Sequence, residues 1–150
     1  MKIASASAEE AGALTEIAFA AKRHWQYPET WILRWQEVLT ITPEYISQNS
    51  TFVAVIDGER VGFCAVQIES GGALLDHLWV LPSFMGKGVG RALFQHAEEV
   101  ARERGALRMR IVGDPHAEQF YSRMGATLYG RELAKMDGEE RYLPLLEKTL

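Results

Sequence analysis

The chain has 150 residues, of which 47% are hydrophobic, and its formal net charge is −4 at pH 7. This size and composition predict a single domain over residues 1–150 and exclude a chain that is disordered throughout. The acidic balance argues against a nucleic-acid-binding protein, and no apolar run is long enough to span a membrane. The one cysteine, Cys64, excludes a disulfide framework and a thiolate metal cluster, so no metal is expected. Cys64 lies in an apolar run and is interpreted as a buried small side chain. No apolar leader is recognisable near the start, and a cytoplasmic protein is expected.

The first third of the chain is predicted to be one strand followed by helices. Ser7 with Glu10 is a capping-box pattern, and Pro43 after Thr42 is typical of a first helical turn. The predicted elements are a strand over residues 3–6, helices over 7–21 and 28–39, and a short helix from 42. An aromatic-rich joint over residues 24–28 separates the two longer helices.

The rest of the chain begins as an antiparallel meander and then alternates helix and strand. The predicted elements are strands over residues 51–56, 61–70 and 74–81, a helix over 88–104, a strand over 107–112, a short helix over 114–124, and strands over 126–130 and 142–150. Asp57-Gly58, Gly71-Gly72 and Asp137-Gly138 supply the turns. We therefore expect an α+β fold in α/β/α layers, with a mostly antiparallel sheet of about six to seven strands. The strands on either side of the long helix are expected to pair in parallel.

The segment between the third meander strand and the long helix carries an unusual pattern. Three glycines alternate over residues 86–90, with Lys87 and Arg91 as cations and no acidic residue. Cations and glycines both destabilise a helix start, where acidic side chains are normally favoured. Free N–H groups in such a turn form a binding site for an anion, so a phosphate-bearing ligand is predicted here.

Two well-known phosphate loops do not match this segment. A Walker loop needs Ser or Thr after Gly-Lys, and Gly88 stands there. A dinucleotide fingerprint that starts at Gly86 or Gly88 needs a third glycine where Arg91 or Leu93 stands.

The segment instead resembles the coenzyme A loop of the GCN5-related N-acetyltransferase superfamily, Arg/Gln-x-x-Gly-x-Gly/Ala after a strand. Here that loop reads Met-Gly-Lys-Gly-Val-Gly over residues 85–90, after Leu-Trp-Val over 78–80. A second family motif, a Phe-Tyr pair before a Gly-Phe pair, reads Phe120-Tyr121 with Gly125-Ala126 downstream. Met85 departs from the usual Arg or Gln, and Asp114 stands near a position where the family often has Asn.

The resemblance implies an N-acetyltransferase domain with acetyl-coenzyme A as cosubstrate. It places the thioester beside the strand before the loop, with one backbone amide of that strand as the donor to the oxyanion. The residues expected to bind the cosubstrate are Leu78, Trp79, Val80, Met85, Gly86, Lys87, Gly88, Val89, Gly90, Arg91, Asp114 and Phe120.

Two residues are expected to move protons during acetyl transfer. The resemblance makes Tyr121 the general acid, and a phenol with a reference pKa of about 10 carries its proton at neutral pH, so it can donate to a departing thiolate. Asp76 is the candidate base, acting through water, since the strand period places it on the same face as Leu78. His77, expected on the opposite face, and Glu69 remain alternative bases. A core position for Tyr121 and a solvent-facing Asp76 also remain open.

The acceptor is expected to be a primary amine of a small molecule or peptide. Trp25, Tyr27, His77 and Arg141 are the candidate acceptor-binding residues, while Trp31 and Trp35 are interpreted as core. A solvated-surface role is favoured for Arg131 and Arg141, and pairing of one of them with a carboxylate on the acceptor is the alternative. A non-catalytic acyl-coenzyme A binding or sensing module is the alternative function. A longer acyl group, an oxygen acceptor and a homodimer are left open.

Overall fold

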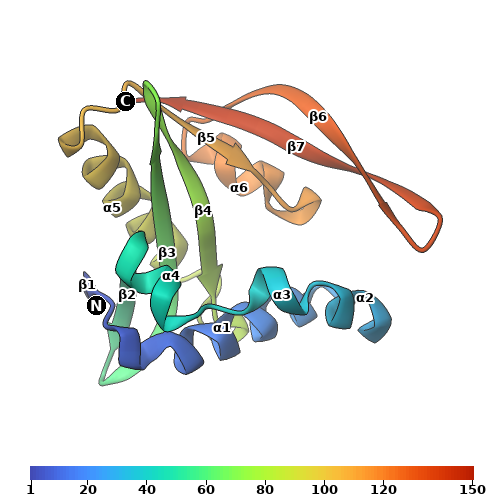
Figure 1. The fold of residues 1–150 in the computed structure, drawn as a ribbon, viewed down its shortest axis with the longest axis horizontal. Coiled ribbons are helices and arrows are strands. Elements are labelled where there is room, and N and C mark those ends of the chain that lie inside the picture. The colour runs from blue at the N-terminus through green and yellow to red at the C-terminus, as the bar shows by residue number, and fades with distance from the viewer.

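The computed structural model describes residues 1–150, and Figure 1 shows how its elements are arranged. The helices are α1 (Ala11–His24), α2 (Glu29–Arg34), α3 (Gln36–Leu39), α4 (Pro43–Gln48), α5 (Val89–Glu103) and α6 (Glu118–Arg123). The strands are β1 (Lys2–Ser5), β2 (Ser50–Ile56), β3 (Glu59–Glu69), β4 (Gly72–Val80), β5 (Arg108–Val112), β6 (Thr127–Met136) and β7 (Glu139–Thr149). None of the helices is long and apolar enough to cross a membrane.

The seven strands form one sheet in the order β1-β2-β3-β4-β5-β7-β6. Every neighbouring pair is antiparallel except β4 and β5, which the long helix α5 connects in parallel. The α+β fold, the number of strands and the parallel pair predicted from the sequence are therefore confirmed.

β4 and β5 stay together over only a short distance. They pair at Ala73 with Met109 and at Leu74 with Arg110, and no further pairs follow. Figure 1 shows the two strands side by side at one end and diverging toward the other. The rest of β4 therefore presents one backbone edge to an opening instead of to a neighbouring strand.

Helices cover both faces of the sheet, and each layer has its own core. One cluster of 17 buried residues lies under α5 and α6, and another of nine lies under α1 and α4. Along β3, Cys64 packs into the first cluster and Phe63 into the second, as strand alternation requires. Burial raises the pKa of the Cys64 thiol to about 12, which agrees with its interpretation as a small core side chain.

A bulge in β4 corrects one prediction from the sequence. Ala65 pairs with His77 and Val66 pairs with Leu75, so Asp76 is an extra residue with no partner on β3. Asp76 consequently turns toward α4, where Tyr45 contacts it, while Leu78 packs in the cluster under α5. The prediction that Asp76 and Leu78 share a face was wrong because strand alternation breaks at a bulge, and His77 lies on the Asp76 face.

Two further predictions differ in extent. The helix predicted over 28–39 is divided into α2 and α3 at Trp35, whose N–H is shared between the carbonyls of Trp31 and Ile32. The last two strands are longer than expected, because Asp137 and Gly138 both adopt positive φ and close a two-residue turn at the hairpin tip. This hairpin reaches α2, where Arg34 forms an ion pair with Asp137 at 2.6 Å.

Gly62 marks the closest approach between β3 and its surroundings. A Cβ atom there would lie 2.8 Å from the backbone oxygen of Trp79 and 3.1 Å from Cδ1 of Leu93. We expect Gly62→Ala to lower the free energy of unfolding by about 1–3 kcal/mol, since neither the strand nor the core can yield easily. Urea denaturation measures this difference.

The matched control is Gly12→Ala in α1, where an added Cβ would meet nothing within 4 Å. That change should leave the free energy of unfolding unchanged or raise it by up to about 1 kcal/mol. Equal effects of the two substitutions would contradict the tight packing at Gly62.

Candidate active site

The glycine loop has a conformation that side chains would disfavour. Gly86 has φ 75° and Gly88, the residue that precedes α5, has φ 84°. A Cβ atom at either position would meet nothing within 4 Å, so the space beside this backbone is open. Glycine is needed here for backbone conformation, and its absent side chain leaves the amides accessible.

The backbone N–H groups from Gly86 to Arg91 donate to no other backbone group. Met85 N–H bonds to Pro82 O at 3.2 Å, and the next donor in sequence is Ala92, to Gly88 O at 3.1 Å. Lys87 and Arg91 form no ion pair, and the first turn of α5 contains no acidic residue. Six successive free donors and two unpaired cations therefore stand at one helix start, a combination that favours anions. Met85, predicted to help bind phosphate, has its amide already in use.

The loop connects directly to the opening beside β4. Leu78, Trp79 and Val80 pair with β3 along one edge, and their other edge faces away from any strand. A Cβ at Gly90 would lie 3.2 Å from the ring of Phe120, so the start of α5 packs closely on α6. The predicted cosubstrate residues on β4, α5 and α6 therefore lie around a single opening.

Tyr121 lies on the α5 side of this opening. Its side chain is 7% exposed and packs against Gly113, Phe94 and Phe120. Burial, with smaller effects of Asp114 and Cys64, raises the pKa of the Tyr121 hydroxyl. Its ring is thus part of the core, while the hydroxyl stays protonated and makes no hydrogen bond within the protein.

Asp76 lies on the other face of the sheet. A hydrogen bond to one of its carboxylate oxygens holds the side chain in position. Tyr45 of α4 donates its hydroxyl proton to Oδ2 of Asp76. Burial, followed by this contact with Asp76, raises the pKa of Tyr45 and keeps it a donor. Nε2 of His77 lies 3.7 Å from the same oxygen. Oδ1 of Asp76 has no partner, and the side chain is 29% exposed.

His77 is buried and held in one protonation state. The indole N–H of Trp79 donates to Nδ1 at 3.0 Å, and an indole nitrogen can only donate. Nδ1 must therefore be unprotonated, and the proton of the neutral ring lies on Nε2, facing Asp76. Burial lowers the pKa of His77, although Asp76 opposes the shift. Glu69, the other alternative base, is engaged by Arg110 at 2.6 Å.

Asp114 is the centre of a polar cluster that crosses the opening. Lys22 of α1 lies 2.7 Å from its Oδ2, and the Tyr27 hydroxyl donates to the same carboxylate at 3.0 Å. The backbone N–H of His116 donates to Oδ1 at 2.9 Å, which caps the turn before α6. Burial alone would raise the pKa of Asp114, but Lys22 and His116 outweigh it and the pKa is lowered.

Aromatic rings surround this cluster on the α1–α3 side. Lys22 Nζ lies 4.1 Å from the ring of Trp35, and the Arg141 guanidinium lies 5.0 Å from the rings of both Trp35 and Tyr27. Trp25 stacks on His116 at 4.7 Å. Tyr27, Trp25 and Arg141, all predicted acceptor residues, are therefore together, whereas His77 lies apart beside Asp76. Trp31 is buried as predicted, and Trp35 lines this wall while also packing against the core cluster under α1 and α4.

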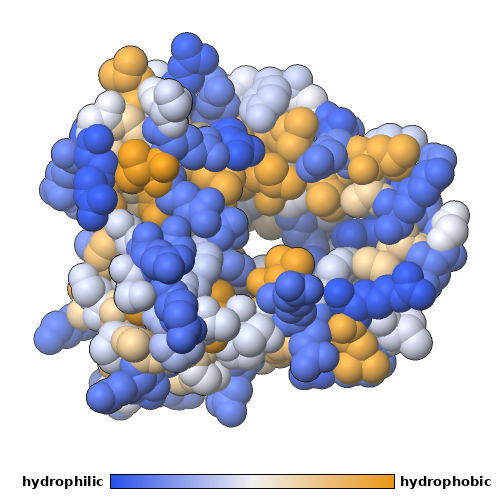
Figure 2. Space-filling view, viewed as in Figure 1, coloured by the Kyte–Doolittle hydropathy of each residue, from blue (hydrophilic) through white to orange (hydrophobic).

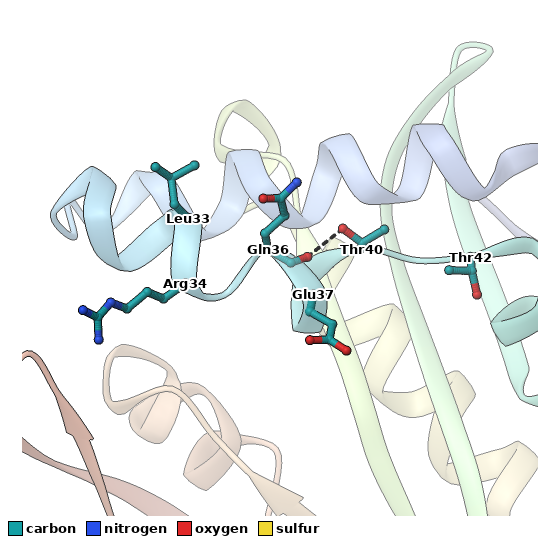
Figure 3. Close-up of a pocket in the computed structure, with 6 residues that line it drawn as sticks. All are labelled: Leu33, Arg34, Gln36, Glu37, Thr40 and Thr42. Carbon is teal, nitrogen blue, oxygen red and sulfur yellow. Dashed lines mark hydrogen bonds between the residues drawn. The ribbon is translucent and has the colours of Figure 1, made fainter.

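The molecular surface is hollowed between two parts of the fold. Figure 2 shows a hollow between the layer of α1–α3 and the side that carries β6 and β7. A separate shallow depression of about 510 Å³ is lined by exposed side chains of α2, α3 and the segment before α4 (Figure 3): Leu33, Arg34, Gln36, Glu37, Thr40 and Thr42. None of the predicted site residues lines that depression.

Three members of the site were not recognised in the sequence. None of the three, Lys22, Tyr45 and His116, carries a local motif. Lys22 contacts Asp114, which is 92 positions away along the chain, and Tyr45 contacts Asp76, which is 31 positions away. His116 contacts Asp114, two positions before it. The one available signal was their position within a predicted helical segment for Tyr45 and His116, and directly after one for Lys22. No group of three or more His, Cys, Asp or Glu side chains is arranged to hold a metal ion.

The free edge of β4 and the free amides at the start of α5 thus lie at one opening between splayed strands. The chain belongs to the acetyltransferase (GNAT) family, whose sequence model matches residues 13–126.

A curated relative and two solved structures show the extent of the similarity. The chain is 39% identical over 99 residues to streptothricin acetyltransferase of Streptomyces lavendulae. The matched region covers 61% of this chain and 52% of that relative. It thus spans about half the length of the curated relatives it matches.

Both structures cover 99% of this chain. A GCN5-related N-acetyltransferase from Rhodopseudomonas palustris has a TM-score of 0.83, 23% identity and 95% coverage of its own chain. The PaiA N-acetyltransferase of Thermoplasma acidophilum, in complex with coenzyme A, has a TM-score of 0.78, 22% identity and 98% coverage. At these identities the two structures establish the fold.

The state of His77 generates a pH prediction. Because its folded pKa lies below the unfolded value of about 6.5, the unfolded chain binds more protons just below that pH. Stability should therefore fall as the pH drops below about 6.5, by up to about 1.4 kcal/mol per pH unit from this residue. Urea unfolding at pH 7.5 and at pH 5.5 measures the free energy of unfolding. Its decrease from the higher to the lower pH should be smaller for His77→Gln than for the wild type.

The matched control is His24→Gln, since His24 is exposed. This variant should lose as much stability between the two pH values as the wild type. An identical loss in His77→Gln would show that His77 is not held neutral.

Proposed function

We propose that this protein is an acetyl-coenzyme A-dependent N-acetyltransferase acting on a primary amine of a small molecule or peptide. The observation that carries the proposal is the run of free amides from Gly86 to Arg91 beside the opened edge of β4. Family membership and the similarity to a streptothricin acetyltransferase support the reaction class.

The residues around the opening suit the cosubstrate. The amides of residues 86–91 would hold its pyrophosphate, with Lys87 and Arg91 adding charge. The free edge of β4 at Leu78, Trp79 and Val80 would bind the pantetheine arm, and one of these amides would stabilise the oxyanion. Asp114 and Phe120 border the same opening. Acetyl-coenzyme A supplies the activated acetyl group.

Tyr121 is proposed as the general acid. Transfer forms a bond from the amine nitrogen to the acetyl carbon and breaks the carbon–sulfur bond, so the sulfur must gain a proton. The Tyr121 hydroxyl keeps its proton because burial raises its pKa, and it has no competing acceptor within the protein. It is therefore available as a donor to the departing sulfur, and because its raised pKa makes it a weak acid, proton transfer requires that the thiolate be desolvated in the same site.

Asp76 is proposed to receive the amine proton, through water. Oδ1 is free to face the acceptor, because Oδ2 is occupied by Tyr45 and lies toward His77. Asp76 and Tyr121 are on opposite faces of the sheet, on either side of the opening. The acceptor would thus approach from the α1–α4 side, while the departing sulfur lies on the α5–α6 side.

Cosubstrate binding is tested at Gly88. We expect Gly88→Glu to weaken acetyl-coenzyme A binding by about 10-fold or more, since it adds strain at positive φ and a negative charge at the helix start. Isothermal titration calorimetry measures the Kd. Gly138→Glu is the matched control, because Gly138 also has positive φ and open space but lies at the hairpin tip.

The control should bind acetyl-coenzyme A as the wild type does. No detectable binding by the wild type, or equal binding by both variants, would refute the phosphate site. Since Gly88→Glu alters the start of α5, the pair Lys87→Ala and Arg91→Ala provides a second test with the loop backbone intact.

Acid catalysis is tested at Tyr121. Tyr121→Phe should lower kcat by about 10²–10⁴-fold while the Kd for acetyl-coenzyme A stays within about twofold, because only the hydroxyl is removed. Release of free thiol with a panel of amines measures kcat. Tyr129→Phe, at an exposed position, is the control.

An unchanged kcat in Tyr121→Phe would remove its role as acid. Tight acetyl-coenzyme A binding without turnover of any amine would instead support the non-catalytic acyl-coenzyme A module.

A further inference from the structure

Almost every charged side chain that is shielded from solvent has a partner of opposite charge. The partially buried lysines and arginines with a carboxylate partner are Lys22, Arg110 and Lys148. The partially buried carboxylates with a lysine or arginine partner are Glu10, Glu69, Glu98, Asp114, Glu118 and Glu147. Two residues are exceptions, Arg141 and Asp76.

Arg141 is the partially buried cation without a carboxylate. Its Nη2 donates to the Tyr27 hydroxyl at 2.9 Å, and no other hydrogen bond engages the guanidinium. The group lies against the rings of Tyr27, Trp31 and Trp35 at 5.0, 5.7 and 5.0 Å. Stacking holds the planar group in place and leaves N–H donors at its edge available, the arrangement in which arginine binds carboxylates.

Asp76 is the partially buried carboxylate without a cation. Its ion-pair contact is with His77, which the Trp79 indole keeps neutral. Tyr45 and His77 engage Oδ2 and leave Oδ1 free. A shielded carboxylate that lacks a positive partner is electrostatically incomplete, and an ammonium group would complete it.

A continuous set of contacts connects the two unpaired charges. The Arg141 guanidinium and Lys22 Nζ share the ring of Trp35, and Lys22 Nζ also lies 5.9 Å from the ring of Trp79. Trp79 bonds to His77, which faces Asp76. Lys22 itself is neutralised by Asp114 at 2.7 Å. The wall between the unpaired charges is therefore aromatic and carries no further unpaired charge.

We infer that the acceptor is an amine that also bears a carboxylate, with its ammonium end at Asp76 and its carboxylate at Arg141. This inference rests on the proposed N-acetyltransferase function. A molecule with both groups would neutralise both unpaired charges, whereas a polycationic amine would place a second positive charge near Arg141 and Lys22. Arg131, the other arginine considered for a carboxylate, is already paired with Glu118 at 2.8 Å.

Two matched triplets of acceptors test the inference. They are L-phenylalanine with L-phenylalaninamide and phenethylamine, and 6-aminohexanoate with 6-aminohexanamide and hexylamine. In at least one triplet, kcat/KM measured by thiol release should be about 10-fold or more higher for the carboxylate than for its amide. Arg141→Gln should abolish this preference by raising KM for the carboxylate about 10-fold more than KM for the amide, and urea denaturation of the variant reports an intact fold.

Arg131→Gln is the matched control and should retain the preference for the carboxylate. The inference is overturned if amides or plain amines are preferred in both triplets. It is also overturned if Arg141→Gln slows the carboxylate and the amide by the same factor.

Calorimetric titration of the same carboxylates into the protein with coenzyme A separates this inference from the proposed function. A carboxylate that binds the wild type and not Arg141→Gln, without thiol release, supports the inference and refutes acetyl transfer to that acceptor. Thiol release from amines with no role for the carboxylate supports the function and refutes the inference. If no carboxylate binds and none is turned over, the inference is overturned.

Discussion

The separation of β4 from β5 is the constraint on which the rest of the structure depends. The two strands share two residue pairs and then diverge, so β4 keeps one edge without a partner. A buried strand edge is costly unless something satisfies its polar groups. Everything that the site requires is arranged around this edge: the free amides at the start of α5, Tyr121 on one face, and Asp76 on the other. An extended ligand that passes between the strands would complete the sheet in the way a neighbouring strand otherwise would.

The opening is bounded on its far side by contacts between distant parts of the chain. Lys22 with Asp114, Tyr27 with Asp114 and Arg141, and Arg34 with Asp137 tie α1–α3 to the second half of the molecule. Exposed ion pairs such as the last contribute little free energy, and shielded ones mainly select one geometry. Their effect here is to hold the aromatic joint after α1 over the opening, so that the acceptor side is a wall of defined chemistry rather than an exposed loop.

Sequence patterns predicted the order of elements, the parallel pair and the glycine turn at the start of α5. These succeed because the signal is local: a capping residue, an alternation or a glycine at positive φ acts within one turn or strand. The bulge at Asp76 was missed because it is defined by pairing with β3, which no pattern within β4 reveals. The division of a predicted helix at Trp35 was missed for a similar reason, since that residue has no helix-breaking character of its own and lies in the wall beside Lys22 and Arg141.

The sequence by itself determined that this chain forms an α+β domain with a loop of free amides at a helix start, because those free amides depend on glycines adjacent in the chain. Only the tertiary structure decided which charges are satisfied. Arg141 and Tyr27 are 114 positions apart, and Lys22 and Asp114 are 92 apart. Whether a charge is paired depends on what lies a few ångströms away in space, and the energy of each pair depends on how far water is excluded from it. Neither quantity is encoded within a stretch of neighbouring residues. The unpaired state of Asp76 and Arg141, on which the proposed acceptor rests, therefore became visible only in the folded chain.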